Sequence, residues 1–533
     1  MKDEVRDTSP HPPFGKGGRG GISSGQSAKC EEEGAGVGAQ GLTFNEPLLF
    51  DQGSPGRRGC TLPECDVPEL KPERLLPRKL LRHDIPGFPE LSEVEVVRHF
   101  TRLSQWNYGV DTGFYPLGSC TMKYNPKINE EVWRLPGFSL AHPYQPESLI
   151  QGALELMYEL EQFLAEVSGM DRVSLQPAAG AQGEVLGMML IRAYLESKGS
   201  PRKRVLVPDS AHGTNPASSA ICGYEVLQIK SGPNGRLDPQ VVANAMDEDV
   251  AAIMVTNPNT LGLFEDQIAE IAKIVHAKGG QVYCDGANLN AIIGISRPGD
   301  TGIDVLHFNL HKTFAVPHGG GGPGAGPVGL KAHLAPFMPV PVIEKKGRRF
   351  VLNDDLPSSV GRVRAFYGNF AALVRAYAYI RSLGPSGLRR VAEVAVINAN
   401  YIMSQLKDHY HLPYDTFCKH ECVFSDARQL PHGVQTIDIA KRLMDYGFHP
   451  PTIYFPLIVK GAMMIEPTET ESKETLDQFI DAMKRIAEEA ERDPELVRSA
   501  PHKTKVSRLD EVKAARQPNL RWKGKTSGEE SGS

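Results

Sequence analysis

The chain has 533 residues, of which 40% are hydrophobic and 23% charged, and its formal net charge is −5. This length and composition predict a soluble globular protein of two or more domains, and the small net charge argues against a general nucleic-acid binder. No apolar run approaches the ~18 residues of a membrane span, and the eight scattered cysteines favour a cytoplasmic protein without a secretion signal.

Residues 1–70 are predicted to be a disordered tail, because glycine, proline and serine dominate them and no helical or strand period emerges. Residues 71–147 are expected to form an N-terminal arm. Within it, residues 92–103 have helical spacing with Ser92 as the N-cap. Residues 109–130 predict an ordered loop, because they are unpatterned yet carry little charge.

Two residues of this loop are candidates for chemistry. Lys123 is either a second cationic group for an anionic ligand or a surface lysine. Cys120 could be a reactive thiol. We favour a plain buried cysteine, because nothing in the sequence indicates a lowered pKa.

Residues 148–384 have the pattern of a large domain. A helix predicted over 150–167 ends at Gly169, and a turn rich in glycine and alanine follows at 178–183, before a helix over 182–196. Small residues at a helix start let backbone N–H groups approach an anion, with the helix dipole behind them. We therefore interpret this turn as a phosphate cup, although small residues also serve close helix packing.

The chain then alternates short apolar strands with helices such as the one predicted over 265–278. This alternation predicts a mostly parallel sheet with helices on both faces. The strands are expected at 205–207, 226–229, 251–255, 282–284 and 305–310.

Two of these strands lead into groups of opposite charge. Asp285 follows strand 282–284, and Lys312 stands 27 residues later, after strand 305–310. Open α/β sheets bind their ligands at the carboxyl ends of the strands, so the carboxylate and the amine are expected in one cleft. A pyridoxal phosphate site needs this pair, because the lysine forms a Schiff base and the aspartate holds the pyridinium nitrogen protonated. The alternative is a buried salt bridge without a cofactor.

His212 falls after another strand, so that its imidazole could stack on a flat cofactor ring; the alternative is a structural loop histidine. The tract HGGGGPGAG, residues 318–326, cannot form a helix or a strand interior. It is either a flexible linker or, as we favour, a place where the backbone approaches a ligand or a partner subunit closely.

Gly384 and Pro385 break a helix and mark the predicted boundary to a smaller α+β domain, residues 385–499, which a polar tail, residues 500–533, follows. In this domain we expect strands at 418–424 and 461–465 and helices at 391–406, 436–446 and 472–491.

Cysteines and histidines give no convincing metal site. Cys418, His420 and Cys422 would share one face of the strand at 418–424, but they are three ligands without a fourth. Cys60 and Cys65 lack a second ligand pair nearby. We therefore expect no metal.

Long stretches of residues 75–500 resemble a known family. They include YPLGSCTMKYNP, QPAAGAQGE, PDSAHGTNPAS, TNPNTLGLFE, YCDGANLNA and HFNLHKTFAVPHGGGGPGAGPVG. The chain resembles the glycine dehydrogenase (decarboxylating) family, the P-proteins of the glycine cleavage system, and more narrowly it is similar to subunit 2 of the two-subunit bacterial form.

The resemblance implies the aspartate-aminotransferase-like fold, fold type I of the pyridoxal phosphate enzymes, with a mostly parallel large domain and a smaller C-terminal domain. It implies that Lys312 carries the cofactor, that Asp285 pairs with its ring nitrogen and that His212 stacks on its ring. The other cofactor-binding residues that it implies are Ala179, Gly180, Ala181, Asn257 and Thr313.

The implied reaction is decarboxylation of glycine with transfer of the aminomethyl group to the lipoyl arm of the H-protein, an oxidation in which a disulfide is the acceptor. Lys312 and His212 would handle the proton movements. The implied partner is glycine dehydrogenase subunit 1, in a heterotetramer with two copies of each subunit. The rival hypotheses are another fold-type-I enzyme, such as an aminotransferase or desulfurase, and a catalytically silent scaffold subunit.

Overall fold

The computed structural model describes residues 46–82, 85, 87–319 and 324–522. By its contacts the chain divides into two units, residues 1–38 and 39–533, and all described residues belong to the second. Most of the predicted tail 1–70, part of the glycine tract 318–326 and the end of the tail 500–533 lie outside the described residues. Among the helices that are described, none combines the length and the apolar character needed to cross a bilayer.

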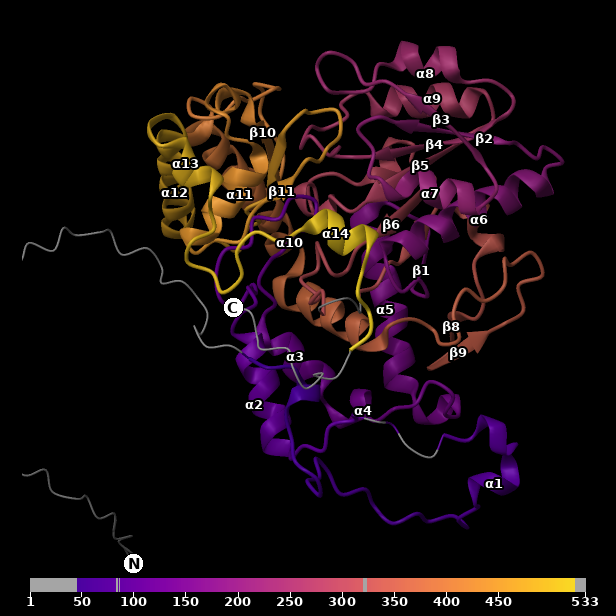
Figure 1. The fold of residues 1–533 in the computed structure, drawn as a ribbon. Coiled ribbons are helices and arrows are strands. Elements are labelled where there is room, and N and C mark those ends of the chain that lie inside the picture. The colour runs from indigo at the N-terminus through magenta and orange to yellow at the C-terminus, as the bar shows by residue number, and fades with distance from the viewer. Residues whose placement is uncertain (1–45, 83–84, 86, 320–323, 523–533) are drawn as a thin grey trace, which may run out of the picture. The chain divides into compact units, whose positions relative to one another are not determined.

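The larger sheet has seven strands in the order β1-β7-β6-β5-β4-β2-β3 (Figure 1). The strands from β6 to β3 in this order are parallel, whereas β7 is antiparallel to both of its neighbours. This confirms the mostly parallel sheet. The strands are β1 Arg172–Ser174, β2 Arg204–Pro208, β3 Glu225–Ile229, β4 Val250–Thr256, β5 Gln281–Gly286, β6 Val305–Phe308 and β7 Val328–Leu330.

Helices cover both faces of this sheet, because the central strands carry apolar side chains on both faces. Val205, Met254 and Tyr283 pack on the side of α6, and Leu206, Ile253 and Cys284 pack on the side of α5, α8 and α9. The sequence predicts such continuous apolar runs for strands that are buried on both faces. The helices are α5 Gln151–Ser168, α6 Gly180–Ser197, α7 Thr214–Ile221, α8 Pro239–Ala245 and α9 Ile268–Ala277.

Local chemistry sets several helix ends. Gly169 ends α5 with a left-handed φ of 71°, as predicted. The helix expected over 265–278 begins later, at Ile268. Its predicted first residue, Glu265, donates its N–H to the side chain of Asn257 and accepts the N–H of Leu237 on its carboxylate, so it belongs to the preceding loop.

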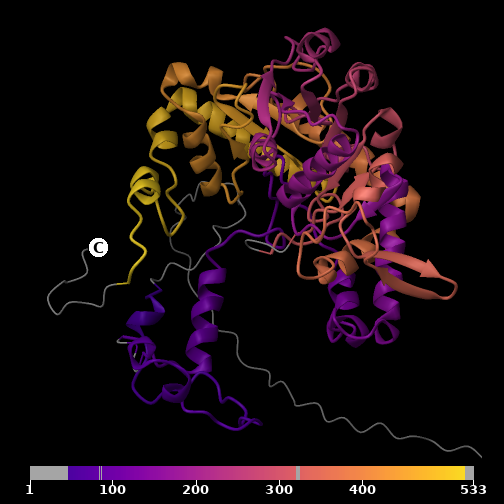
Figure 2. The same cartoon turned by 90° about the vertical axis from the view of Figure 1, so that its right-hand side faces the viewer.

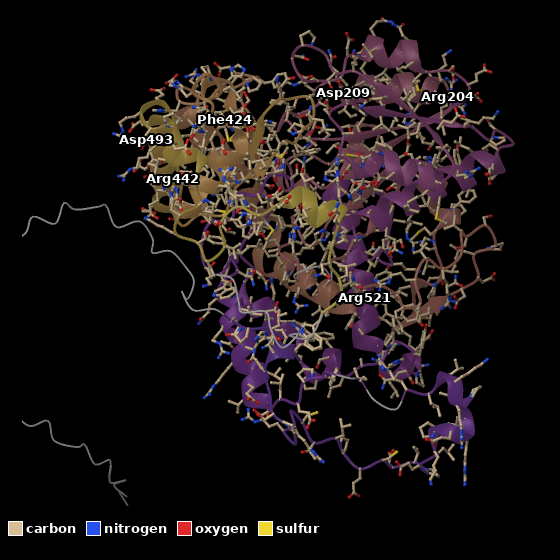
Figure 3. All side chains as sticks on the ribbon, viewed as in Figure 1. Arg204, Asp209, Phe424, Arg442, Asp493 and Arg521 are labelled. Carbon is tan, nitrogen blue, oxygen red and sulfur yellow. The ribbon has the colours of Figure 1, made fainter. Side chains whose placement is uncertain are left out.

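A long helix, α10 Phe370–Leu406, joins the larger sheet to the C-terminal elements, and it is broken at Gly384, where φ is 62° and ψ is −176°. Beyond it, β10 Cys422–Ser425, β12 Ala462–Ile465 and β11 Thr452–Ile453 form an antiparallel sheet in that order. This sheet has its own apolar core, which includes Phe424 (Figure 3). The division into domains at residue 384 stays a prediction, although the predicted helix break is confirmed.

The strand predicted over 418–424 is wrong at its start, because β10 begins only at Cys422. The backbone before it bonds elsewhere: Cys418 bonds through both its N–H and its carbonyl to the side chain of Asn400, and Lys419 donates to the carbonyl of Gly262. Cys418 and His420 therefore do not share a strand face with Cys422.

The remaining elements are helices of the arm and of the C-terminal region and a hairpin (Figure 2). Helix α2 has the predicted N-cap at Ser92, which forms a capping box with Glu95. The α-helices and strands are α1 Pro72–Leu75, α2 Glu93–Ser104, α3 Lys127–Trp133, α4 Pro136–Ser139, β8 Val342–Lys346, β9 Arg349–Asn353, α11 Thr436–Asp445, α12 Lys473–Arg492, α13 Pro494–Arg498 and α14 Glu511–Arg516. The 3-10 helices are η1 Leu49–Asp51, η2 Arg78–Leu80, η3 Glu147–Leu149, η4 Leu289–Ala291, η5 Pro298–Thr301, η6 Ala332–Phe337, η7 Asp426–Arg428 and η8 Leu430–His432.

Candidate active site

Asp285 lies near the carboxyl end of β5, buried to 2% exposure. Its Oδ1 accepts the N–H of Ala287 at 2.9 Å, and its Oδ2 accepts the side-chain amide of Asn215 at 3.2 Å. Burial by itself raises the pKa of this carboxyl, but electrostatic interactions of the carboxylate with His307, Lys312 and His212 outweigh burial and lower it below its ordinary value. Asp285 is therefore an ionised carboxylate at neutral pH.

Lys312 does not end a strand as expected. Strand β6 stops at Phe308, because Leu310 turns to bond the carbonyl of Ala325 on the returning chain. The lysine thus stands on a turn four residues beyond the strand, half-buried, and among the described residues its Nζ has no hydrogen-bond partner. A salt bridge between Asp285 and Lys312 is also absent from the described part of the chain. The amine is available to a ligand.

The imidazoles around Lys312 are neutral. Burial lowers the pKa of His212, and the charge of Lys312 lowers it further against the attraction of Asp285. Burial and Lys312 together lower the pKa of His311 to about 3, and the same two causes lower that of His318. The rings of His212, His311 and His318 are therefore mainly uncharged at neutral pH, and His212 can accept a proton.

The start of α6 is where a phosphate cup is predicted. Ala179 is the N-cap residue but contributes no side-chain cap, and no described residue accepts a hydrogen bond from the N–H groups of Gly180 or Ala181. A Cβ at Gly180 would lie 2.5 Å from Oδ1 of Asn309, so any other residue there would have to displace the Asn309 side chain. The free N–H groups at the positive end of an 18-residue helix suit a phosphate.

Three buried polar atoms near Asp285 and Lys312 have no partner within the described residues: Thr256 Oγ1, Thr313 Oγ1 and Asn215 Oδ1. Thr256 pairs in register with Asp285, Thr313 follows Lys312 and Asn215 contacts Asp285. A buried polar group without a partner costs about 1–3 kcal/mol, so three together indicate that a polar ligand belongs here. With the free amine, the carboxylate and the free N–H groups, these residues fit pyridoxal phosphate.

Asn257 lies at the end of β4 but fits the predicted role less well. Its side-chain oxygen accepts the N–H of Glu265 at 3.0 Å, so this oxygen is already used inside the protein. Only its amide N–H₂ is left for a ligand, since no described residue accepts from it.

Sequence reasoning missed His307, Asn309, Asn215 and Thr256. His307 bonds through Nδ1 to the hydroxyl of Tyr283 at 2.6 Å, and its Nε2 lies 3.3 Å from Oδ1 of Asp285. The signal that could have found it is the register of adjacent strands, because β6 places His307 directly beside Asp285.

Lys123 is not a surface lysine. Its Nζ is buried and donates to Asn290, Tyr379 and Glu469 at 2.7–3.1 Å, and the opposing Glu469 charge raises its pKa despite burial. Cys120 is a largely buried thiol whose pKa burial raises to about 11, against the opposite effect of Lys312. The unreactive interpretation of Cys120 fits this environment.

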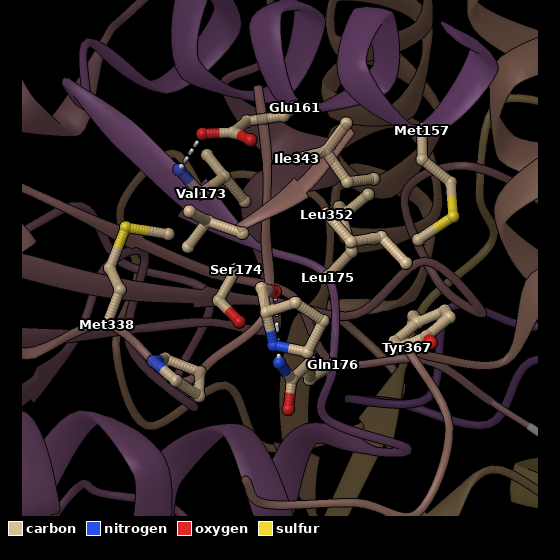
Figure 4. Close-up of a pocket in the computed structure, with 13 residues that line it drawn as sticks. Met157, Glu161, Val173, Ser174, Leu175, Gln176, Met338, Ile343, Leu352 and Tyr367 are labelled. Carbon is tan, nitrogen blue, oxygen red and sulfur yellow. Dashed lines mark hydrogen bonds between the residues drawn. The ribbon is translucent and has the colours of Figure 1, made fainter. Parts of the chain in front are cut away.

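A large open pocket of about 990 Å³ lies beside these residues. Residues of the arm and of the lysine turn line it, including Leu117, Cys120, Met122, Lys123, His311 and His318. A second cavity, between α5 and the ends of β1 and β8, holds only about 30 Å³ (Figure 4). That space admits water but no cofactor, and none of the predicted site residues lines it.

Solved structures with this fold include a glycine decarboxylase and an aminotransferase. One titled as glycine decarboxylase (P-protein) of the glycine cleavage system, in inhibitor-bound form, is 21% identical and covers 77% of this chain and 93% of that chain at a TM-score of 0.66. An aspartate aminotransferase from Thermus thermophilus is 15% identical and covers 70% of this chain and 99% of that chain at 0.52. At these identities the likeness shows the fold alone. Fold and site together define a pyridoxal-phosphate-dependent enzyme of fold type I.

Sequence relatives identify the family to which the chain belongs within this class of enzymes. The family model described as Glycine cleavage system P-protein matches residues 68–346, and that described as Glycine dehydrogenase, C-terminal domain matches residues 391–505. Proteins of Alkaliphilus oremlandii and Halalkalibacterium halodurans, each named "Probable glycine dehydrogenase (decarboxylating) subunit 2", are 58% and 59% identical, covering 89% and 90% of this chain and 98% and 99% of their own lengths. The chain belongs to the glycine cleavage system P-protein family. The resemblance of the motifs is thereby confirmed.

Proposed function

We propose that the chain decarboxylates glycine and transfers the remaining aminomethyl group to the lipoyl arm of an H-protein. The observation that carries the proposal is the ionised Asp285 together with the unpartnered amine of Lys312 at the carboxyl edge of the sheet. Relatives that match nearly the whole chain bear the name glycine dehydrogenase (decarboxylating).

Each part of the site would hold one part of the cofactor. Lys312 Nζ would bind its aldehyde carbon, Asp285 its ring nitrogen, and the N–H groups of residues 179–181 its phosphate. Thr256, Thr313 and the amide of Asn257 would satisfy its remaining polar atoms, and His212 would stack on its ring. When bound, pyridoxal phosphate supplies a sink for the two electrons that stay on the glycine α-carbon as carbon dioxide leaves.

The protein's own groups prepare this chemistry. Asp285 keeps its negative charge because His307, Lys312 and His212 oppose the effect of burial on its pKa, so it favours a protonated ring nitrogen. His212 is neutral and its Nδ1 is engaged by Thr214 at 3.0 Å, which leaves Nε2 to accept a proton. Once Lys312 is displaced by the amino group of glycine, its Nζ can also take up a proton.

The acceptor must reach the site. Cleavage of the carbon–carbon bond of glycine leaves two electrons that reduce the lipoyl disulfide, so that one sulfur takes the aminomethyl group and the other takes a proton. The pocket of about 990 Å³ beside His311 and His318 is large enough for a lipoyl arm.

The name "subunit 2" of the relatives points to a partner subunit 1. We propose that the working enzyme contains two copies of each subunit, that subunit 1 lacks the cofactor lysine, and that the assembly operates in the cytoplasm.

The test is exchange of labelled bicarbonate into glycine by the co-expressed subunits with lipoylated H-protein. Lys312→Ala is the inactive variant and Lys345→Ala, which removes an exposed lysine of β8, is its matched control. We expect exchange that needs pyridoxal phosphate, is lost in Lys312→Ala and persists in Lys345→Ala.

Cofactor absorbance without exchange would contradict the proposal in favour of another fold-type-I enzyme. Absence of cofactor absorbance from the wild-type protein would support the silent-scaffold hypothesis instead.

A further inference from the structure

A second group of buried polar side chains lies close to Lys312, and it comes from the C-terminal region. His420, Glu421 and Glu466 are each 0% exposed. His420 Nε2 lies 3.8 Å from a carboxylate oxygen of Glu421 and 3.9 Å from one of Glu466. Neither ring nitrogen of His420 has a hydrogen-bond partner within the described residues.

Both glutamates bind one short segment of the arm, residues 119–121. The N–H of Ser119 donates to Glu421 at 2.8 Å. The N–H of Thr121 donates to Glu466 at 2.9 Å, and the Thr121 hydroxyl donates to it at 2.6 Å. The Ser119 hydroxyl makes longer contacts with Glu421, at 3.3 and 3.4 Å. Each of the four carboxyl oxygens thus has at least one hydrogen-bond contact with the segment.

The backbone of this segment is in an unfavourable conformation. Ser119 and Thr121 have φ values of 60° and 49°, in the left-handed region that residues with a Cβ, and β-branched ones above all, rarely adopt. Such a conformation persists only where surrounding contacts impose it. The two carboxyl groups provide those contacts.

The segment forms part of the pocket wall beside Lys312. Cys120 lies between the two bound residues and lines the pocket, as do Leu117 before the segment and Met122 after it. Leu117 also pairs with Ile465, the last residue of β12, immediately before Glu466. The charge of Lys312 acts on both glutamates and on Cys120, so the segment and its two carboxyl groups lie within electrostatic reach of the amine.

We infer that Glu421 and Glu466 are positioning residues, which hold residues 119–121 in their strained conformation and thereby form the pocket wall along which the lipoyl arm enters. This role rests on the proposed function for the identity of the arm. The shaping of the wall itself does not depend on that identity. In this role the carboxyl groups act through the segment, which they bind directly.

Variants of Glu466 separate positioning from other roles. In Glu466→Ala the Thr121 N–H and hydroxyl lose their acceptor, so the segment relaxes. In Glu466→Gln the amide oxygen still accepts the N–H, and the Thr121 hydroxyl can reverse to accept from the amide nitrogen. Glu161→Ala is the matched control, because Glu161 is also a buried carboxyl that accepts a backbone N–H, that of Val173, but lies in the small cavity under α5 (Figure 4).

The first readout needs no enzyme activity: alkylation of Cys120 by iodoacetamide in the cofactor-loaded complex, resolved by mass spectrometry. We expect Cys120 to react at least about tenfold faster in Glu466→Ala than in the wild type, because the wall opens. Wild type, Glu466→Gln and Glu161→Ala should react slowly. The buried Cys284 should stay unlabelled throughout, which excludes global unfolding.

The second readout is bicarbonate exchange as a function of lipoylated H-protein concentration. We expect Glu466→Ala to raise KM for the H-protein about tenfold with unchanged cofactor absorbance, and Glu466→Gln to restore it to within about threefold.

Unchanged Cys120 labelling in Glu466→Ala, or a Glu466→Gln variant as defective as Glu466→Ala, would overturn the inference. If Cys120 labelling follows the expected pattern in the wild type and the variants but the wild type shows no bicarbonate exchange, the proposed function fails while the positioning role stands.

Discussion

Two sets of buried carboxyl groups lie within electrostatic reach of Lys312, and their pKa values are shifted in opposite directions. Electrostatic interactions of Asp285 with His307, Lys312 and His212 overcome burial and lower its pKa. Burial raises the pKa of Glu466 to about 7, and burial together with the neighbouring Glu466 raises that of Glu421 well above its ordinary value. His420 cannot compensate them as a cation, because burial lowers its pKa to about 3.

The difference shows that burial alone does not decide the charge of a carboxyl group. Opposite charges of neighbours decide it on the side of Asp285, whereas the other side offers mainly neutral hydrogen-bond donors from Ser119 and Thr121. The ionised group suits an electrostatic role in catalysis. The groups that retain their protons suit a structural role at neutral pH and below.

The largest effect is expected on the ionised side. Asp285→Asn keeps the shape and the bond from Ala287 but removes the charge, so kcat/KM for glycine decarboxylation should fall about 10²–10³-fold, a typical loss for one electrostatic group. Steady-state exchange kinetics measure it, with Glu466→Gln expected within about threefold of the wild type. Similar losses of kcat/KM in Asp285→Asn and Glu466→Gln would contradict the difference in charge between the two carboxyl groups.

The protonated side should appear in the pH dependence of stability. The pKa of Glu466 is about 7 in the folded protein and 4.5 ordinarily, so the folded state binds the extra proton between these values. This extra proton stabilises the folded protein by up to about 3 kcal/mol. The stabilisation is fully present below pH 4.5 and is lost as the pH rises through 7.

Glu466→Gln cannot lose a proton, so its stability relative to the wild type should increase between pH 4.5 and 7. Calorimetric Tm values across this range measure the difference, with Glu161→Gln as the control. A Tm difference independent of pH would argue that Glu466 is ionised throughout.

A smaller effect is expected for the neutral ring on the side of Asp285. His212→Ala removes the stacking surface and should weaken cofactor binding about fivefold to tenfold, whereas His212→Phe keeps an aromatic ring and should bind within about twofold of the wild type. Titration of the apoprotein with pyridoxal phosphate, followed by absorbance, gives both constants. Equal losses in the two variants would indicate that a ring nitrogen, not the ring face, holds the cofactor.

The smallest effect is expected at Cys120. Burial raises the pKa of its thiol to about 11, so it is protonated at neutral pH and unreactive. Cys120→Ser should retain exchange activity within about twofold, and mild oxidants should affect both proteins equally. Protection by the substitution would show that Cys120 is an oxidation-sensitive thiol.

The two sides also differ in what the sequence reveals. Asp285 and Lys312 are predictable because each follows a short apolar run, and parallel strands bring their carboxyl ends to one edge. The small residues at the start of α6 can be recognised from the local sequence in the same way. Lys312 stands beyond its strand, however, because the pairing of Leu310 with Ala325 depends on the returning chain.

The carboxyl groups of the other side leave no such local pattern. Glu421 and Glu466 bond to residues 302 and 345 positions away, and those contacts exist only once the arm has joined the C-terminal sheet. Sequence reasoning about this region considered His420 with Cys418 and Cys422, on a strand that in fact begins only at Cys422. Its true neighbours follow from tertiary packing.

The most direct test of the contrast is the infrared absorption of protonated carboxyl groups, compared between pH 5 and pH 8 in the wild type, Glu466→Gln and Asp285→Asn. We predict a protonated-carboxyl band that fades as the pH rises through about 7, is weakened in Glu466→Gln and is unchanged in Asp285→Asn. A band that survives in Glu466→Gln but disappears in Asp285→Asn would contradict the assignment of charge on both sides of Lys312.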